Sequence, residues 1–290
     1  MRMESRNVKA KRIMLISMAF MLFTILFSLF PTRTNCPTYS PAIFQNGLTD
    51  IVTSIDMQRV ADHVKNLSML GSRVTGYEGS GAAAQYIADS FRSYNLSVEN
   101  QTYPVLVPID HGSSITVLSP TLLNLTAYAL WPNYVQTCSI PPEGIEGDLI
   151  YVGTGTLPEF NNKTVEGSIV LMDFNSYDNW LNAAKLGAKA VVFIEPAETV
   201  FFEARSKFLV TPLRLPRLYV NATDGKQLKD MALEGVVTVR LNSAMNYENV
   251  EAQNIIGIAQ GELPNEVIVV AAHYDAWSVV PRLAPGADEA

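Results

Sequence analysis

A stretch of 18 residues at positions 13–30 contains no charged residue and no proline, and it constrains this chain more than any other feature of its sequence. A helix needs about 17–25 residues to cross a bilayer, whereas the apolar core of a cleaved signal peptide spans about 7–15 residues. The stretch ends at Pro31, and residues 32–35 contain no small-x-small cleavage motif. We therefore predict a transmembrane signal anchor at 13–30, with a cleaved signal peptide as the alternative.

The residues that flank this stretch predict its orientation. Residues 1–12 contain five Lys and Arg and one acidic residue, and such a basic flank stays in the cytoplasm. Residues 31–47 are polar and contain three prolines, which indicates an extended stalk. The sequence thus predicts a single-pass protein of the cell membrane whose bulk is extracellular.

The charge of the outward part excludes one class of partner. The whole chain has 21 Lys and Arg and 28 Asp and Glu, so without residues 1–12 there remain 16 and 27, a net charge of −11. This balance gives no basic surface for nucleic acid. Six Asn-x-Ser/Thr sequons fit an exported, glycosylated surface. They begin at Asn66, Asn95, Asn100, Asn124, Asn162 and Asn221.

The chain has two cysteines, Cys36 in the stalk and Cys138 near the middle. An oxidising compartment permits a disulfide between them, and two free thiols are the alternative. Their spacing matches no metal-binding motif, so the cysteines point to no site.

After the stalk, helical and strand-like patterns alternate. Asp56 is predicted to cap a helix at 57–67, and a second helix is predicted at 80–94. Residues 103–145 are irregular, with a strand-like stretch at 115–118. A compact α/β unit is expected next. Its strands are expected at 148–152, 168–174, 189–194, 218–220 and 236–241, and its helices at 179–186 and 225–233.

The last two predicted strands are 253–259 and 267–272. Gly261, Pro264 and Asn265 between them favour a hairpin turn. Residues 267–272 are apolar without alternation, as expected for a strand that is buried on both faces. The sequence therefore predicts a buried strand that ends directly before His273.

Polar residues at the end of that strand are the best candidates for chemistry. Ligands of open α/β sheets lie beyond the carboxyl ends of strands, which is where His273 and Asp275 occur. Imidazole is a good zinc ligand, and a carboxylate such as Asp275 can orient it. Asp288, in a Gly-rich acidic loop, is able to bridge two metal ions. The alternative is a pair of ordinary strand-end residues.

The other histidines are expected to have no catalytic role. His63 borders the apolar face of the first helix and is predicted to be structural, and His111 to be a solvated loop residue. We expect Arg73 to pair with a local acid, with a substrate contact as the alternative. Trp277 either packs or lines a pocket.

These segments resemble the co-catalytic zinc exopeptidases, a family that includes the secreted bacterial leucyl aminopeptidases and glutamate carboxypeptidase. The first segment is the loop Gly-Ser-Arg-Val-Thr-Gly at 71–76 with the helix that follows. The second comprises the strands at 254–261 and 267–272 with His-Tyr-Asp at 273–275. The third is Gly-Ala-Asp-Glu-Ala at 286–290. Residues 147–241 are similar to a protease-associated domain, which several members of the family insert at this position.

The resemblance implies a site for two zinc ions. His273 would bind one ion, Asp288 would bridge both, and Asp275 would orient His273; the register leaves Glu289 as an alternative to Asp288. The family pattern continues beyond this loop with a glutamate general base, further acidic ligands and a second histidine. Residues 1–290 would then supply at most two metal ligands, so we expect a C-terminally truncated chain that is inactive alone.

The predicted fold class is α/β, with a partial zinc-exopeptidase domain interrupted by a protease-associated domain. The predicted function is hydrolysis of terminal peptide bonds by metal-activated water, with peptides as substrates. The alternative is a non-catalytic membrane-anchored protein that uses its protease-associated domain to bind proteins. The expected order is a cytoplasmic tail (1–12), the anchor (13–30), the stalk (31–47), the first part of the peptidase domain (48–109), the inserted domain with its flanks (110–246) and the start of the metal-binding part (247–290).

Overall fold

The computed structural model describes residues 49–50, 52–263 and 265–286. No helix in these ranges is long and apolar enough to cross a membrane. The predicted anchor, the stalk, Cys36 and Asp288 lie outside the described residues. The chain divides into two compact units, Met1–Asp56 and Met57–Ala290, and the first is described only at 49–50 and 52–56. The fold below is that of the second unit.

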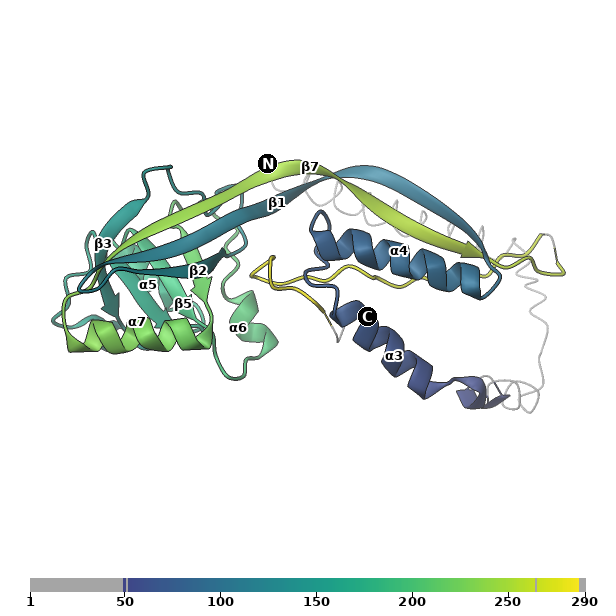
Figure 1. Ribbon diagram of the computed structural model, residues 1–290, viewed down its shortest axis with the longest axis horizontal. Coiled ribbons are helices and arrows are strands. Elements are labelled where there is room, and N and C mark those ends of the chain that lie inside the picture. The colour runs from purple at the N-terminus through teal and green to yellow at the C-terminus, as the bar shows by residue number, and fades with distance from the viewer. Residues whose placement is uncertain (1–48, 51, 264, 287–290) are drawn as a thin grey trace, which may run out of the picture. The chain divides into compact units, whose positions relative to one another are not determined.

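Two helices begin this unit, as the sequence predicts. They are α3 (Met57–Ser68) and α4 (Glu78–Ser93) (Figure 1). Helix α4 buries alanines on one side, which lets it lie close to the long strands beside it. The expected apolar face of α3 is mostly exposed, and Leu67 is its buried residue. Periodicity therefore predicts the helix correctly but not its burial.

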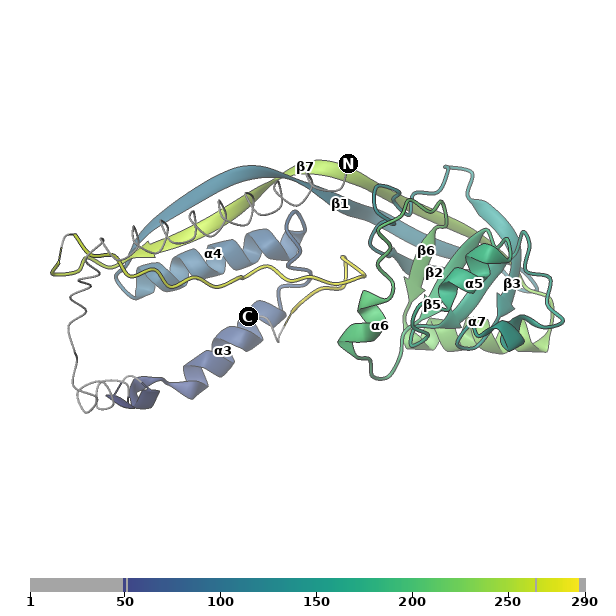
Figure 2. The same cartoon turned by 180° about the vertical axis from the view of Figure 1, so that it is seen from behind.

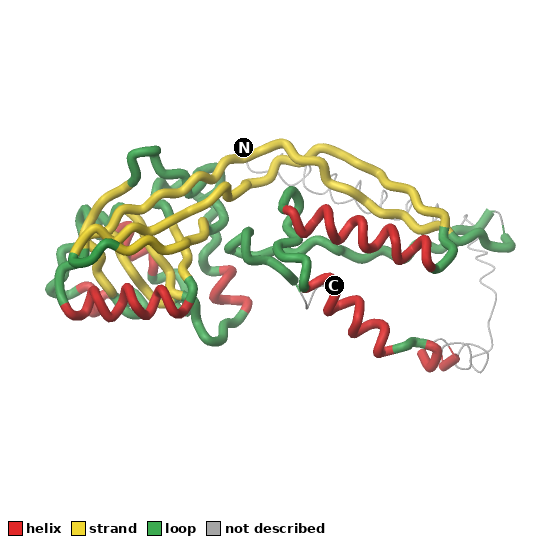
Figure 3. Tube along the Cα trace, in the orientation of Figure 1, coloured by secondary structure: helices red, strands yellow, loops and turns green. Residues whose placement is uncertain are grey.

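A long two-stranded ribbon dominates the unit. Strands β1 (Ser97–Ser119) and β7 (Thr238–Ile258) pair antiparallel from Ser97 opposite Ile258 to Ser119 opposite Thr238. Both appear as one continuous pair in the tube view (Figure 3). Most of the residues predicted as strands at 115–118, 236–241 and 253–259 do lie in this ribbon. The predictions that most of 103–145 is irregular and that the last two strands are separate were wrong. A ribbon leaves one edge of each strand unpaired, and prolines such as those of β1 are tolerated there.

One end of the ribbon closes into a barrel with five shorter strands. The order around it is β1-β2-β6-β5-β4-β3-β7, and the neighbours from β3 to β6 are parallel (Figure 2). The strands predicted in this region are confirmed. The shorter strands are β2 (Leu123–Ala129), β3 (Ile145–Tyr151), β4 (Ile169–Asp173), β5 (Ala190–Ile194) and β6 (Arg217–Val220). The helical segments are η1 (Leu157–Phe160), α5 (Trp180–Lys185), α6 (Phe201–Arg205) and α7 (Ala222–Glu234).

The main hydrophobic core is formed by the strands of this barrel together with the helices α5 and α7 that pack on them. Strands β4 and β5 are buried along almost their whole length, which explains their unbroken apolar sequence. Helix α7 starts at Asn221, whose Oδ1 accepts a hydrogen bond from the Asp224 backbone N–H at 2.9 Å. Gly225 of this helix lies against Ile194 of β5. The approach is close, since a Cβ added at Gly225 would be 2.4 Å from the Ile194 Cγ2. The result is a mixed α/β fold.

The predicted buried strand at 267–272 is wrong, and so is the hairpin before it. These residues are extended but pair with no strand among the described residues. The side chains of Val267, Ile268, Val269 and Val270 are 80–92% exposed. The apolar run favours burial, but a strand also requires a hydrogen-bonded neighbour, and no described strand pairs with this run. Beyond Leu241, β7 is paired with β1 alone, and its other edge is not used by residues 267–272.

Candidate functional site

His273 and Asp275 are close together on an open surface. The His273 side chain is 93% exposed and that of Asp275 is 50% exposed, with 3.7 Å between His273 Nδ1 and Asp275 Oδ1. This separation suits an ion pair with protonated imidazole and is too long for a hydrogen bond. The carboxylate thus faces the ring nitrogen that an orienting partner of a metal-bound histidine would face.

The donor chemistry of this pair fits a zinc ligand with its orienting carboxylate. Within the described ranges no three His, Cys, Asp or Glu side chains gather into a group that could hold a metal ion. Asp288 and Glu289 lie outside the described residues, so the choice between them as bridging ligand stays a prediction. The described part of the chain therefore contributes His273 as a candidate zinc ligand and Asp275 as the carboxylate that would orient it.

Arg73 joins the two segments that carry the predicted ligands. Its Nη1 donates to the Tyr274 carbonyl oxygen at 2.5 Å, its Nε donates to that of Pro285 at 2.7 Å, and its Nη2 donates to that of Gly286. The arginine is completely buried. The expectation that it pairs with a local acid missed these contacts, because backbone carbonyls leave no signal in a sequence.

The backbone around Arg73 supports the same arrangement. Its N–H donates to the Ala284 carbonyl at 2.9 Å, and its carbonyl accepts from the Ala276 N–H at 3.2 Å. Ser72 Oγ donates to the Pro281 carbonyl at 2.5 Å. A small apolar cluster lies beneath these bonds and includes Val74, Val107, Ala276 and Ala284. The loop at 71–76 thus holds the segment 274–286 in place through hydrogen bonds and apolar contacts.

Tyr274 fastens the same segment to the ribbon. Its hydroxyl donates to the backbone carbonyl of Gln253 in β7 at 2.9 Å. Burial raises the pKa of the Tyr274 hydroxyl, and the nearby Asp275 carboxylate adds to the shift. The phenol therefore stays protonated and keeps donating at neutral pH. His273 and Asp275 lie on either side of this anchored residue.

Trp277 packs against the barrel. Its indole stacks on the Phe208 ring, with 4.5 Å between ring centroids and 27° between ring planes. Close by, the Trp131 backbone N–H donates to the Val279 carbonyl at 2.7 Å. Of the two interpretations open for Trp277, packing holds, and the contact links the candidate site segment to the loop between α6 and β6.

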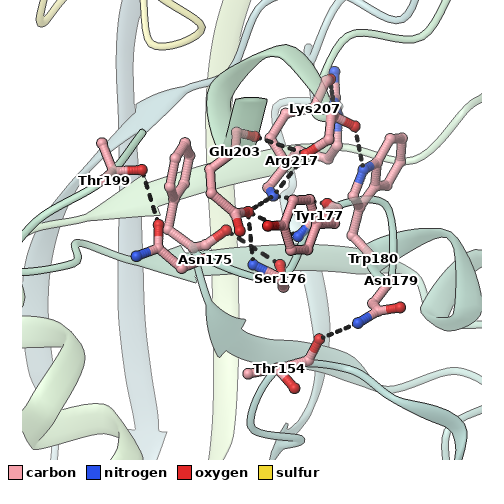
Figure 4. A network of polar contacts seen from close by, with 12 residues as sticks. Thr154, Asn175, Ser176, Tyr177, Asn179, Trp180, Thr199, Glu203, Lys207 and Arg217 are labelled. Carbon is pink, nitrogen blue, oxygen red and sulfur yellow. Dashed lines mark hydrogen bonds and ion pairs between the residues drawn. The ribbon is translucent and has the colours of Figure 1, made fainter. Parts of the chain in front are cut away.

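A buried polar network holds the loop that carries Phe208 (Figure 4). Glu203 Oε2 accepts hydrogen bonds from the backbone N–H groups of Ser176 and Tyr177, and Lys207 Nζ lies 3.3 Å from it. Lys207 Nζ also donates to the Tyr177 carbonyl at 2.7 Å. Burial lowers the pKa of Lys207 to about 8, against the opposing effect of the Glu203 carboxylate.

Arg217 completes this network from β6. Its guanidinium donates to the Lys207 and Trp131 carbonyls and lies over the Trp180 ring, 4.6 Å from the ring centroid. Burial lowers the pKa of Arg217 to about 10. The loop is therefore tied to the barrel at Lys207, directly before Phe208.

The remaining candidate residues have structural surroundings. His63 contacts the hydroxyls of Tyr86 at 2.7 Å and Tyr94 at 3.0 Å, which confirms a structural role. The prediction that His111 lies in a loop was wrong, because it belongs to strand β1, where its side chain pairs with Glu248 of β7. Among the described residues Cys138 is a buried free thiol, and its disulfide with Cys36 stays a prediction because Cys36 lies outside these residues. The asparagines of the sequons are exposed except Asn221, which is half-buried; the exposed ones are Asn66, Asn95, Asn100, Asn124 and Asn162.

The chain is similar in sequence to two curated peptidases, although no family model matches it. It is 24% identical over 230 residues to carboxypeptidase Q from Xenopus laevis, which covers 72% of this chain and 48% of that protein. It is 22% identical over 231 residues to carboxypeptidase Q from Bos taurus, covering 72% and 47%. The chain thus spans about half the length of the curated relatives it matches.

Two solved structures share its fold. A peptidase M28 precursor from Shewanella amazonensis has a TM-score of 0.51 at 16% identity and covers 74% of this chain and 54% of its own. BSAP, a zinc aminopeptidase from Bacillus subtilis, also has a TM-score of 0.51, at 22% identity, with 74% and 50% covered. Most of the second unit therefore has a fold found in zinc peptidases, and the relatives are by name carboxypeptidases and an aminopeptidase.

Proposed function

We propose that this chain contributes metal-binding residues to a zinc-dependent exopeptidase that hydrolyses terminal peptide bonds of extracellular peptides. The observation that carries the proposal is the similarity to carboxypeptidase Q, which extends over 72% of the chain. Support comes from the shared fold of the zinc aminopeptidase and from the His273–Asp275 pair at 3.7 Å. Which chain end is cleaved depends on residues that line the substrate pocket.

In this proposal His273 would hold one zinc ion, and Asp288 would be the ligand shared by a pair of zinc ions. When bound, such a metal pair supplies a water-derived nucleophile at neutral pH and polarises the scissile carbonyl. With the metal bound, Asp275 would accept a hydrogen bond from His273 Nδ1–H once these two atoms, 3.7 Å apart in this structure, move closer. This bond would hold the imidazole in the tautomer that leaves Nε2 as the ligand atom for the metal. Tyr274 and Arg73 hold the backbone on which these side chains stand.

The proposal also includes the cellular setting. Residues 13–30 anchor the protein in the cell membrane as a signal anchor, and the sequons carry glycans on the extracellular side. The barrel built mainly from residues 110–246 acts as a protease-associated domain that covers the cleft and helps to select substrates. Exposed asparagines at five of the six sequons are compatible with glycosylation.

An activity assay on the full-length protein tests this proposal. We expect single residues to be released from unblocked peptides, and we expect peptides blocked at both termini to resist cleavage. A chelator should abolish release and zinc should restore it, because the water nucleophile depends on the metal. His273→Ala should remove activity while His111→Ala retains it.

Two outcomes would count against the enzyme. Internal cleavage of doubly blocked peptides would exclude an exopeptidase. Absence of any zinc-dependent hydrolysis, together with specific capture of a protein by the isolated extracellular part, would favour the non-catalytic binding protein instead.

A further inference from the structure

We propose that Arg73 is a positioning residue that fixes the segment of His273 relative to the segment that leads to Asp288. The inference rests on the proposed zinc site and adds to it a residue that acts through the backbone of both segments. Arg73 lies about 200 residues before both segments in the chain, yet it contacts both. It is thus the described side chain that bridges them directly.

The contacts of the guanidinium divide between the two segments. Nη1 donates to the carbonyl of Tyr274, the residue directly after His273. Nε and Nη2 donate to the carbonyls of Pro285 and Gly286, the residues that precede the acidic loop. One rigid, planar group therefore orients a peptide that begins one residue after His273 and two peptides that precede Asp288 in the chain.

Arginine is suited to this role by its shape. A guanidinium presents five N–H donors in a fixed fork, whereas a lysine ammonium is a single point with three donors. The fork of Arg73 reaches three acceptors that lie in different directions. A single ammonium nitrogen at the same position would not reach all three. Because Arg73 is completely buried, losing these partners would leave polar groups without water or hydrogen bonds.

The packing around Arg73 shows that the arrangement is closely fitted. Gly286 has a φ of +54°, and a Cβ there would lie 2.8 Å from Arg73 Nη2 and 2.7 Å from the Ala276 Cβ. A larger residue at this position would push the two segments apart. The backbone hydrogen bonds of Arg73 to Ala284 and Ala276 add a second connection between the same segments.

The experiment measures zinc affinity by calorimetry in the 290-residue chain. Arg73→Lys keeps the positive charge and removes the fork, and we expect it to weaken zinc binding by about tenfold or more, the range found when outer partners of metal ligands are lost. Val74→Ala is the matched control. It loosens the same loop by removing methyl groups from the apolar cluster and leaves the guanidinium contacts intact. Its zinc affinity should stay near that of the wild type.

A second measurement needs no variant. If Arg73 favours zinc binding by joining the two segments, zinc must in turn favour the joined state, because linkage is reciprocal. Zinc should therefore slow hydrogen exchange of the Arg73 and Ala276 backbone amides in the wild-type chain. The amides of α7 in the barrel should not change.

The outcomes separate this proposal from the proposed function. If Arg73→Lys and Val74→Ala lose zinc affinity equally, or if zinc leaves the Arg73 and Ala276 amides unprotected, the positioning role is refuted. If His273→Ala binds zinc as well as the wild type does, the proposed zinc site itself fails. Weaker zinc binding in both His273→Ala and Arg73→Lys, with Val74→Ala unaffected, supports both proposals.

Discussion

The indole ring of Trp277 stacks on the phenyl ring of Phe208, with 4.5 Å between the ring centroids. Trp277 follows Asp275 by two residues, and Phe208 belongs to the loop between α6 and β6 of the barrel. The stack therefore connects the candidate metal-binding segment to a loop that the Glu203–Lys207–Arg217 network holds in place.

We predict that this stack contributes a measurable coupling energy to stability. In a double-mutant cycle with Phe208→Leu and Trp277→Leu, the coupling in urea unfolding should be about 0.5–1.5 kcal/mol, the value of a well-placed aromatic pair. Phe201→Leu replaces Phe208→Leu in the control cycle, since Phe201 is an exposed ring outside this stack. Equal coupling energies in the two cycles would show that the stack adds nothing specific.

A second prediction concerns the glycine beside Arg73. Gly286→Ala should lower the free energy of unfolding by about 1–3 kcal/mol, because its φ is positive and the new Cβ would meet Arg73 and Ala276. Gly261→Ala is the control, as a Cβ there meets nothing within 4 Å. Urea denaturation of both variants gives the comparison. If Gly286→Ala is as stable as Gly261→Ala, the neighbours of the new Cβ move aside without lowering the free energy of unfolding.

The buried lysine predicts a dependence of stability on pH. The folded-state pKa of Lys207 is about 8, below the ordinary value of 10.5, because burial disfavours the charged form. Below pH 8 the lysine is protonated in both states. Between pH 8 and 10.5 the unfolded chain holds this proton and the folded chain does not, so stability rises with pH across that window.

Lys207→Met should abolish this rise. The difference in unfolding free energy between wild type and variant should shift in favour of the wild type by on the order of 2 kcal/mol from pH 8 to pH 10. Taking the difference cancels the other titrating groups. Lys163→Met, at an exposed position, is the matched control. A wild-type advantage that is constant with pH would contradict the assigned pKa direction.

The exposed apolar run predicts self-association. Val267, Ile268, Val269 and Val270 are unpaired by any described strand, and such an edge is a template for pairing between molecules. Ile268→Lys should therefore reduce aggregation in light scattering. Val236→Lys adds the same charge at an isolated exposed valine and should have little effect. If both variants reduce aggregation equally, the effect comes from the change in net charge and not from the apolar run.

The strands of the barrel were predictable because their sequences match their burial. Residues 190–194 are apolar in sequence and completely enclosed in β5, so pattern and environment agree. The ribbon was not predictable. β1 contains prolines and is exposed along much of its first half, so neither alternation nor an apolar run marks it. Its pairing with β7 depends on residues about 140 positions apart.

The sequence predicted the residue types of the candidate site but not the contacts that hold these residues in place. His273 and Asp275 do lie together, as their spacing suggested. The strand expected before them does not form, since an apolar run cannot supply the neighbouring strands that burial requires. The role of Arg73 was missed because its acceptors are carbonyl oxygens, which every residue has, in segments more than 200 positions away.

Zinc binding to the 290-residue chain tests the central claim most directly. Calorimetric titration should give zinc binding that is weakened in His273→Ala and unchanged in His111→Ala, whose histidine instead pairs with Glu248. Both variants remove an exposed imidazole, so a nonspecific effect would appear in both. Zinc affinity that is the same in His273→Ala as in the wild type would contradict the assignment of this segment to a zinc site.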